Sequence, residues 1–127
     1  MGAHQHHEEL VEGIVGQLAR VFSQSGQGVY IYLDDMHKAC NRKFSSMLGY
    51  GSPEKWAAVE GSFPKFVAKA SQRTLISAYR GAMEKKAGSA IEVTWNKKSG
   101  GTVKTQVILV PIAYGGHLFA LHFVSKK

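Results

Sequence analysis

Apolar residues recur at intervals of three and four near the start of the chain and alternate with polar residues near its end. Between residues 8 and 24 the apolar positions fall on one stripe of a helix. The stripe consists of Val11, Ile14, Val15, Leu18, Val21 and Phe22. Two glycines within residues 25–28 then favour an end to the helix. The pattern predicts an amphipathic helix over 8–24 whose apolar face covers another surface.

Short elements follow this helix. β-branched and aromatic residues predict a strand at 29–33, and Ser52 followed by Pro53 is typical of a helix start. In chain order we expect strands at 29–33 and 36–40, helical turns at 42–48, a short helix from Pro53 to about Gly61, and a loop containing Pro64.

The second half of the chain begins with another amphipathic segment. Residues 71–86 predict a helix with Ser71 as its N-cap and Gly88 as its stop. Alternating residues then predict three strands. They lie at 90–97, 102–111 and 117–124, joined by turns at 98–101 and 113–116. Two groups of strands separated by helices indicate an α+β domain with one antiparallel sheet.

Length and composition restrict the class of protein. A chain of 127 residues fits one domain, and its single cysteine cannot form an internal disulfide. No apolar run reaches the roughly 20 residues needed to span a bilayer, and the N-terminus lacks a signal-peptide core. We therefore expect a cytoplasmic protein with a disordered or tag-derived start at 1–7, a flanking helix at 8–24 and one domain at 25–127.

The formal net charge is +7, from 16 basic and 9 acidic residues. This balance raises nucleic acid as an alternative partner, with Tyr30, Tyr32 and Phe119 as the exposed aromatic residues of a sheet face. The basic residues are scattered, however, and the N-terminal helix is better placed to cover those aromatic rings. A nucleic-acid-binding α+β module therefore stays the alternative, less favoured hypothesis.

The segment from Ala39 to Trp56, ACNRKFSSMLGYGSPEKW, resembles a PAS domain. The positions that match the family pattern are Asn41, Phe44, Gly49, Tyr50, Ser52, Pro53 and Glu54, and the hairpin NKKSGGTVKTQVILVPI is similar to the family's late hairpin. The resemblance covers about residues 25–125. It implies a five-stranded antiparallel sheet of order 2-1-5-4-3, with the short helices and the longer helix over one face.

The resemblance also implies a sensory or interaction domain and not an enzyme. It implies a cavity between sheet and helices for a small apolar or aromatic ligand, and an unknown output partner. The pocket candidates are Asn41, Phe44, Met47, Leu48, Trp56, Phe66, Tyr79, Val93, Trp95, Val107 and His122. The helix before such a domain packs on the other sheet face or mediates a homodimer. Its candidates are Val11, Ile14, Val15, Leu18, Val21 and Phe22.

Specific cofactors find little support in the sequence. In the flavin-adduct motif of related photosensors the cysteine follows the asparagine, whereas Cys40 precedes Asn41. No histidine occurs between residues 38 and 116, which argues against haem. Nearby Lys38 and Arg42 could favour a reactive Cys40 thiolate, but a small half-buried strand residue is the preferred interpretation.

Metal binding and catalysis also find little support in the sequence. Three histidines of the first seven residues, His4, His6 and His7, have no neighbouring ligands in the sequence, so no metal site is predicted. A third hypothesis is a small enzyme with a buried aspartate or histidine. Both aspartates, Asp34 and Asp35, sit in an expected tight turn, which argues against it.

Overall fold

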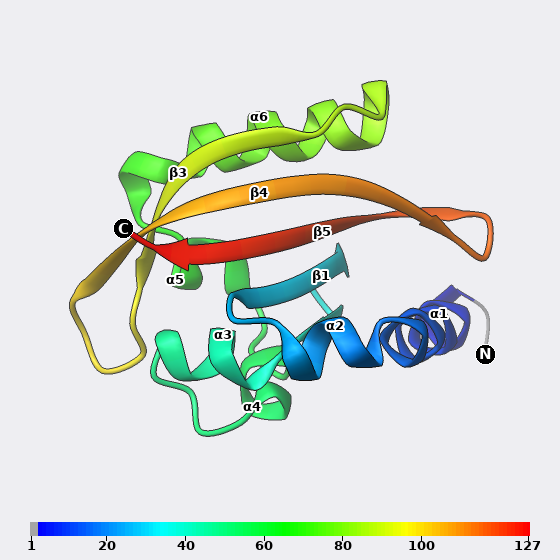
Figure 1. Ribbon diagram of the computed structural model, residues 1–127, viewed down its shortest axis with the longest axis horizontal. Coiled ribbons are helices and arrows are strands. Elements are labelled where there is room, and N and C mark those ends of the chain that lie inside the picture. The colour runs from blue at the N-terminus through cyan, green and yellow to red at the C-terminus, as the bar shows by residue number, and fades with distance from the viewer. Residues whose placement is uncertain (1–2) are drawn as a thin grey trace.

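The computed structural model describes the backbone of residues 3–127 and the side chains of residues 6–61 and 63–127. Its centre is an antiparallel sheet of order β2-β1-β5-β4-β3, as predicted (Figure 1). The strands are β1 (Gly28–Asp34), β2 (His37–Cys40), β3 (Ser89–Asn96), β4 (Thr102–Tyr114) and β5 (His117–Lys126). The fold is therefore α+β.

Helices lie on both sides of this sheet. Four follow β2 in the chain: α3 (Arg42–Met47), α4 (Pro53–Ala57), α5 (Ser62–Phe66) and α6 (Lys69–Lys85). Two precede β1: α1 (Ala3–Gln17) and α2 (Ala19–Gln24). Side chains alternate between the two faces of a strand, so β1 contributes Tyr30 to one apolar cluster and Val29 and Ile31 to another.

The cluster under α3–α6 is called the inner core. It is rich in aromatic side chains, with Phe44, Trp56 and Trp95 almost fully buried. Their rings meet edge to face, at centroid distances of 5.5 Å for Phe44 with Trp56 and 5.2 Å for Phe44 with Trp95. Such geometry suits the ring quadrupoles and fixes the rings relative to one another.

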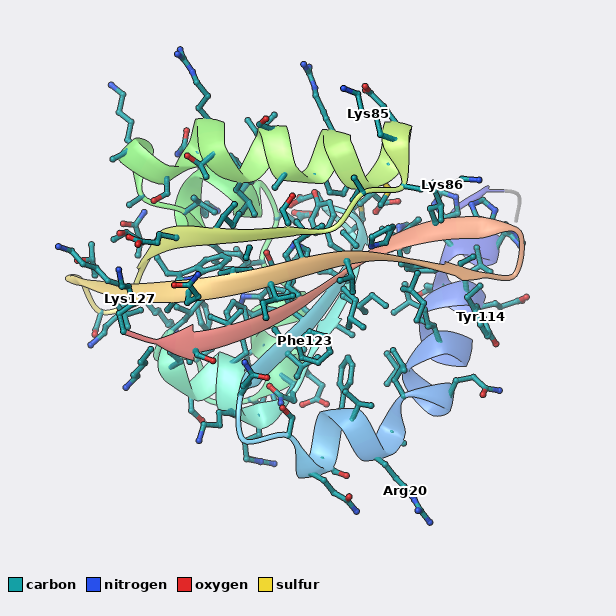
Figure 2. The ribbon with its side chains drawn as sticks, turned by 45° about the horizontal axis from the view of Figure 1, so that its top comes forward. Arg20, Lys85, Lys86, Tyr114, Phe123 and Lys127 are labelled. Carbon is teal, nitrogen blue, oxygen red and sulfur yellow. The ribbon has the colours of Figure 1, made fainter. Side chains whose placement is uncertain are left out.

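The cluster under α1 and α2 is called the outer core. It is mainly aliphatic, with Leu10 and Ile14 of α1 buried against β1 and β5. Tyr114 and Phe123 lie at its margin (Figure 2). All six residues of the predicted N-terminal stripe belong to it, but of these only Ile14 is fully buried. The stripe packs on the second sheet face of its own chain, and Leu10 extends it.

The N-terminal helix differs from its predicted form in two ways. It begins at Ala3, so the helix includes residues 3–7, for which a disordered or tag-derived start was predicted. It is interrupted at Leu18, which joins α1 to α2. Residues 1–2 and the side chain of His4 lie outside the described part, and the division into domains stays a prediction.

The short elements also differ from prediction at several ends. The loop around Pro64 is helix α5, and α4 ends at Ala57 instead of near Gly61. Helix α6 starts after Ala68, because the Ser71 hydroxyl accepts a hydrogen bond from the Thr94 N–H instead of capping the helix. Its last turn closes at Lys86 with φ 54°, so a lysine takes the left-handed position that Gly88 was expected to provide.

Candidate functional site: a cavity between the sheet and α6

A cavity of about 430 Å³ lies between the sheet and α6. Its walls come from β1, β5, α5 and α6. The lining residues are Tyr30, Tyr32, Phe63, Leu75, Ile76, Tyr79, Arg80, Glu84 and His122. This volume falls within the range of about 300–1,000 Å³ that is usual for small-molecule sites. The lining is mainly apolar and aromatic.

Helix α6 supplies both the wall and the mouth of the cavity. Leu75 and Tyr79 lie four residues apart on its buried face. Ile76, which is 43% exposed, lies with the exposed Arg80 and Glu84 at the rim. The cavity is therefore apolar inside and carries charges of both signs at its entrance.

His122 is the polar group in the floor of this cavity. It is 2% exposed, and its ring stacks on Tyr30 of the neighbouring strand with centroids 3.7 Å apart and planes 10° apart. Burial lowers the pKa of His122 to about 3, so the imidazole is neutral at pH 7. Its Nδ1 has no hydrogen-bond partner among the residues that the structure describes.

A buried polar atom without a partner is uncommon and costs about 1–3 kcal/mol. His122 Nδ1 is itself buried, although other atoms of the residue line the cavity. His122 thus contributes one polar side chain to a mainly apolar lining, which is the usual composition of a small-molecule site.

A second void of about 30 Å³ adjoins the cavity. The two share the lining residues Tyr30, Tyr32, Phe63 and Leu75. Trp56 lines the small void, and its indole Nε1 likewise has no hydrogen-bond partner among the described residues. Both unpartnered nitrogen atoms are themselves buried, in residues that line one or the other of the two spaces.

Lys38 is among the residues that line the small void. Its Nζ donates to the carbonyl oxygens of Asp35 and Val59 and lies 4.0 Å from the Asp35 carboxylate. Burial lowers the pKa of Lys38, although the charge of Asp35 opposes this effect. The ammonium group is thus held by its own chain.

The predicted pocket residues occupy three different environments. Tyr79 and His122 line the cavity, and Trp56, Phe66 and Trp95 line the adjoining void. The aliphatic candidates and Phe44 fill the inner core: Phe44, Leu48, Val93 and Val107. Asn41 and Met47 lie instead along a surface groove between α2 and α3.

Several lining residues were not among the predicted pocket residues. Tyr30 and Tyr32 alternate along β1 and so share the cavity face, a signal that the sequence already contained. Leu75, Ile76 and Arg80 were missed because a helical stripe shows which residues face the sheet but not where the packing leaves space.

Asn41 joins the two layers of the molecule. Its Oδ1 accepts from the N–H groups of Phe44 and Val29, each at 3.0 Å. Its Nδ2 donates to the carbonyls of Phe22 and Gln27, each at 3.1 Å. One buried amide therefore caps α3, holds the start of β1 and ties down the end of α2, which explains its position in structural terms.

Cys40 lacks the exposure and the low pKa of a reactive thiol. Its side chain is buried in the inner core. Burial raises the pKa of Cys40 to about 12, against the opposing effect of hydrogen bonds with Ser45. A thiol with this pKa is a poor nucleophile.

The aromatic surface required for nucleic-acid binding is not formed by the three residues suggested for it. Tyr30 and Tyr32 face the helices α3–α6, whereas Phe119 is buried on the opposite face under α1. Basic residues are also dispersed, with Arg20, Lys86 and Lys127 projecting from different ends of the molecule (Figure 2).

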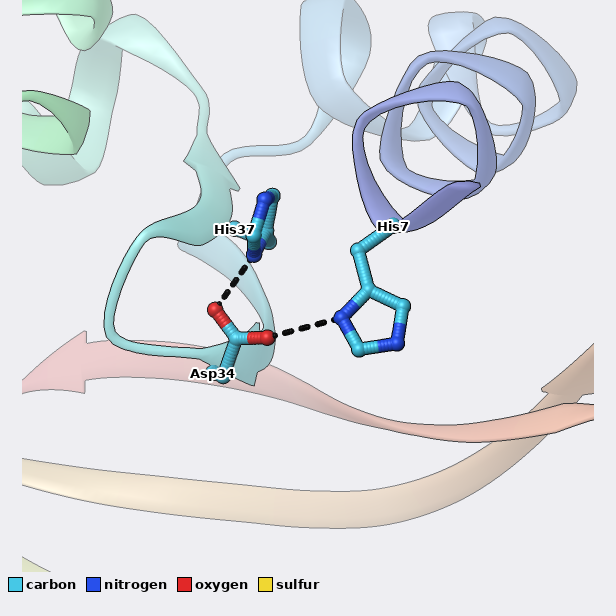
Figure 3. Close-up of side chains that lie close together, drawn as sticks. All are labelled: His7, Asp34 and His37. Atoms are coloured by element: carbon cyan, nitrogen blue, oxygen red, sulfur yellow. Dashed lines mark hydrogen bonds and ion pairs between the residues drawn. The ribbon is translucent and has the colours of Figure 1, made fainter. Parts of the chain in front are cut away.

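The expectation that no ligands converge on the N-terminal histidines is wrong for His7. Its Nδ1 lies 3.0 Å from Asp34 Oδ2, and His37 Nδ1 lies 2.6 Å from Asp34 Oδ1 (Figure 3). The sequence did not show this because the path of α1 over the sheet brings together residues 27 positions apart.

The sheet order and the helix-covered cavity define a class of fold, an antiparallel α+β sheet with a small-molecule-sized space on one face. A PAS domain from a two-component sensor histidine kinase matches with a TM-score of 0.67 and 13% identity, over 91% of this chain and 99% of that one. The PAS domain of a Colwellia psychrerythraea protein matches with a TM-score of 0.69 and 18% identity, over 90% and 97%. That of an HTR-like protein from Haloarcula marismortui matches with 0.64 and 18%, over 97% and 99%.

This chain has the PAS fold, and the resemblance noted in its sequence is confirmed. Neither a family model nor a curated protein matches its sequence. Among the residues that the structure describes, no helix is long and apolar enough to cross a membrane.

Proposed function

We propose that this chain is a non-catalytic sensory domain that binds a small aromatic or apolar molecule in the cavity between the sheet and α6. The observation that carries the proposal is the mainly apolar and aromatic cavity of about 430 Å³, with the neutral imidazole of His122 in its lining. The PAS fold of sensor-kinase domains supports a role in signal transduction. A cytoplasmic location remains a prediction.

The ligand enters beside Ile76 and lies against the aromatic rings of the floor. Tyr32 contributes to the wall from β1, and Tyr79 closes the helix side, whereas the two faces of the Tyr30 ring are covered by Phe44 and His122. Tyr32 and Tyr79 meet edge to face at 5.8 Å. A planar apolar or aromatic molecule matches this surface, because it packs against the aromatic side chains of Tyr32, Phe63 and Tyr79.

Occupancy of the cavity reaches the other sheet face through β1 and β5. In β1, Tyr30 lines the cavity while its neighbours Val29 and Ile31 support α1. In β5, His122 lies between Leu121 and Phe123 of the outer core. A small displacement of these strands alters the seat of α1, so the ligand favours one packing of α1 over another.

Titration with indole, followed by ¹H–¹⁵N correlation spectra, tests the proposal. Amide shifts are expected at Tyr30, Leu75 and Tyr79, and smaller shifts along α1. Ile76→Trp blocks the mouth and should abolish the shifts at the cavity. Met36→Trp is the matched control, because Met36 is 61% exposed in the turn between β1 and β2 and is not among the residues that line this cavity. Shifts that are equal in both variants would place indole elsewhere.

A homodimer is a second proposal. Ile108 and Phe123 are opposed on β4 and β5, and their side chains form an apolar strip on the sheet face that carries α1 and α2. A second copy of this chain covers the strip. Sedimentation analysis should detect a dimer that Ile108→Glu converts to a monomer; a wild-type monomer at all concentrations would refute this proposal.

A further inference from the structure

One end of α1 carries a polar cluster that the cavity does not explain. His7 projects from α1 toward Asp34 at the end of β1, and His37 at the start of β2 faces the same carboxylate (Figure 3). One ligand atom from each residue lies within 4.8 Å of the other two. The three groups thus converge on one point between a helix and the adjacent strand turn.

The spacing and the donor types match a transition-metal site. Ligand atoms around one tetrahedral ion with bonds of about 2.1 Å lie roughly 3.4 Å apart. The two hydrogen-bond distances of 2.6 and 3.0 Å and the upper limit of 4.8 Å bracket this value. Two imidazole nitrogens and one carboxylate oxygen suit Zn²⁺ and similar late divalent ions, whereas Ca²⁺ and Mg²⁺ prefer oxygen donors alone.

The three side chains range from buried to accessible. The side chain of His37 is 6% exposed, that of His7 28% and that of Asp34 41%. Asp34 Oδ1 also accepts a hydrogen bond from the Met36 N–H at 3.0 Å, which orients the carboxylate. Such support from neighbouring groups is typical of metal ligands.

Two further histidines border the same point. The His117 ring lies 5.7 Å from that of His7, and His6 Nε2 lies 3.3 Å from His117 Nε2. The fourth coordination position of a tetrahedral ion can be filled by a water or by one of these imidazoles. The site therefore does not require four protein ligands.

We propose that His7, Asp34 and His37 bind a late first-row divalent metal ion, with Zn²⁺ as the ion to test. The ion ties α1 to the end of β1, the strand whose Tyr30 and Tyr32 line the cavity. It therefore restrains the element that the cavity ligand is proposed to move. The site itself goes beyond the proposed function and does not depend on it.

Isothermal titration of the full chain with Zn²⁺, after treatment with a chelator, measures the affinity and the number of ions bound. One ion per chain is expected, and Asp34→Asn and His37→Gln should each weaken binding at least ~10-fold. Asp35→Asn is the matched control. This substitution alters the neighbouring carboxylate of the same turn, which accepts a hydrogen bond from the Gly61 N–H. The Zn²⁺ affinity of Asp35→Asn should therefore stay within about 2-fold of wild type.

The histidine-rich N-terminus can bind metal without the fold, and the variants separate the two cases. Asp34 and His37 lie outside that segment, so unchanged affinity in Asp34→Asn and His37→Gln would overturn the proposal, as would the absence of Zn²⁺ binding to the wild type. Zn²⁺ should also slow hydrogen exchange of α1 amides in wild type and Asp35→Asn but not in Asp34→Asn. Circular dichroism in chelator confirms that each variant is folded.

Discussion

The two faces of the sheet are packed with different kinds of side chain. The inner core packs interlocked aromatic rings and leaves a mainly apolar cavity lined in part by His122. The outer core packs aliphatic side chains of α1 and α2 onto β1 and β5, and polar contacts at His7 accompany it at one end. The inner core is a rigid frame with an internal space, and the outer core is formed by helices packed on the surface of the sheet.

This difference assigns ligand binding to the inner core and the conformational response to the outer core. Interlocked rings define a cavity because they cannot collapse into it without leaving their edge-to-face geometry. A helix held along one stripe can shift or detach without disturbing the frame, because its stability is local. The shared strands β1 and β5 then connect the two faces. Each prediction below perturbs one face, or the connection, and asks whether the other responds.

Truncation of the inner frame should have the largest effect. Trp95 is 2% exposed, packs against Tyr30 and Phe44, and donates from Nε1 to Thr105 Oγ1 at 2.8 Å. Trp95→Ala should lower the free energy of unfolding by about 3–5 kcal/mol, as measured by urea denaturation. Met36→Ala, at a residue 61% exposed, should change it by less than about 0.5 kcal/mol. Equal losses of stability in Trp95→Ala and Met36→Ala would contradict the role of the inner core as a rigid frame.

Truncation of the outer core should act locally. Ile14 is 1% exposed in the outer core, and Ile14→Ala should lower the stability of α1 docking by about 2–4 kcal/mol. Hydrogen exchange should become faster in α1 while β3 and β4 stay protected. Gly16→Ala is the opposite control, because nothing lies within 4 Å of the added methyl group, and it should strengthen α1 by about 0.5–1 kcal/mol. Loss of protection throughout the sheet in Ile14→Ala would show that the faces are not separable.

Removal of the amide that joins the layers should cost somewhat less. Asn41→Ala deletes four hydrogen bonds and leaves the Val29 N–H buried without its side-chain partner, for a loss of about 2–3 kcal/mol. The comparison is Ser52→Ala at the exposed start of α4, where one cap bond to the Lys55 N–H is lost at about 0.5–1 kcal/mol. A thermal or urea unfolding series should rank the two in this order. The reverse ranking would assign Asn41 only a local capping role.

The smallest predicted effect depends on pH. Because the pKa of His122 falls to about 3 in the folded chain and returns to about 6.5 on unfolding, the unfolded state binds more protons between these values. Stability is therefore full above pH 6.5 and declines as the pH falls toward 3. Between pH 7 and 5 the wild type should lose roughly 2 kcal/mol more than His122→Gln. The other histidines are common to both proteins and cancel in this difference, so equal pH slopes would contradict the buried neutral state.

Local chemistry made much of the fold predictable. Ser52 followed by Pro53 marked the start of α4 correctly, with Ser52 Oγ accepting from the Lys55 N–H. The glycines at 100 and 101 provided the left-handed residues of the β3–β4 turn. The sheet order came from the resemblance of the Asn41–Glu54 segment to PAS domains and is confirmed. These features depend on residues that are close together in the chain.

The site was less predictable because it depends on what packing leaves open. Phe44 and Tyr79 are both large residues facing the inner layer, yet only Tyr79 borders the cavity. Ser71 was a reasonable N-cap by type, but the Thr94 N–H of β3 competes for its hydroxyl. The contact of His7 with Asp34 requires the course of α1 across the sheet. Each of these outcomes is set by tertiary arrangement and not by local pattern.

Native mass spectrometry of freshly purified protein tests the central claim, a ligand site on the inner face, most directly. The spectra of wild type, Ile76→Trp and Met36→Trp are compared. The account predicts that wild type and Met36→Trp retain the same small molecule, of a mass that fits about 430 Å³, and that Ile76→Trp does not. A wild type that carries no small molecule and gains none when indole is added would contradict it.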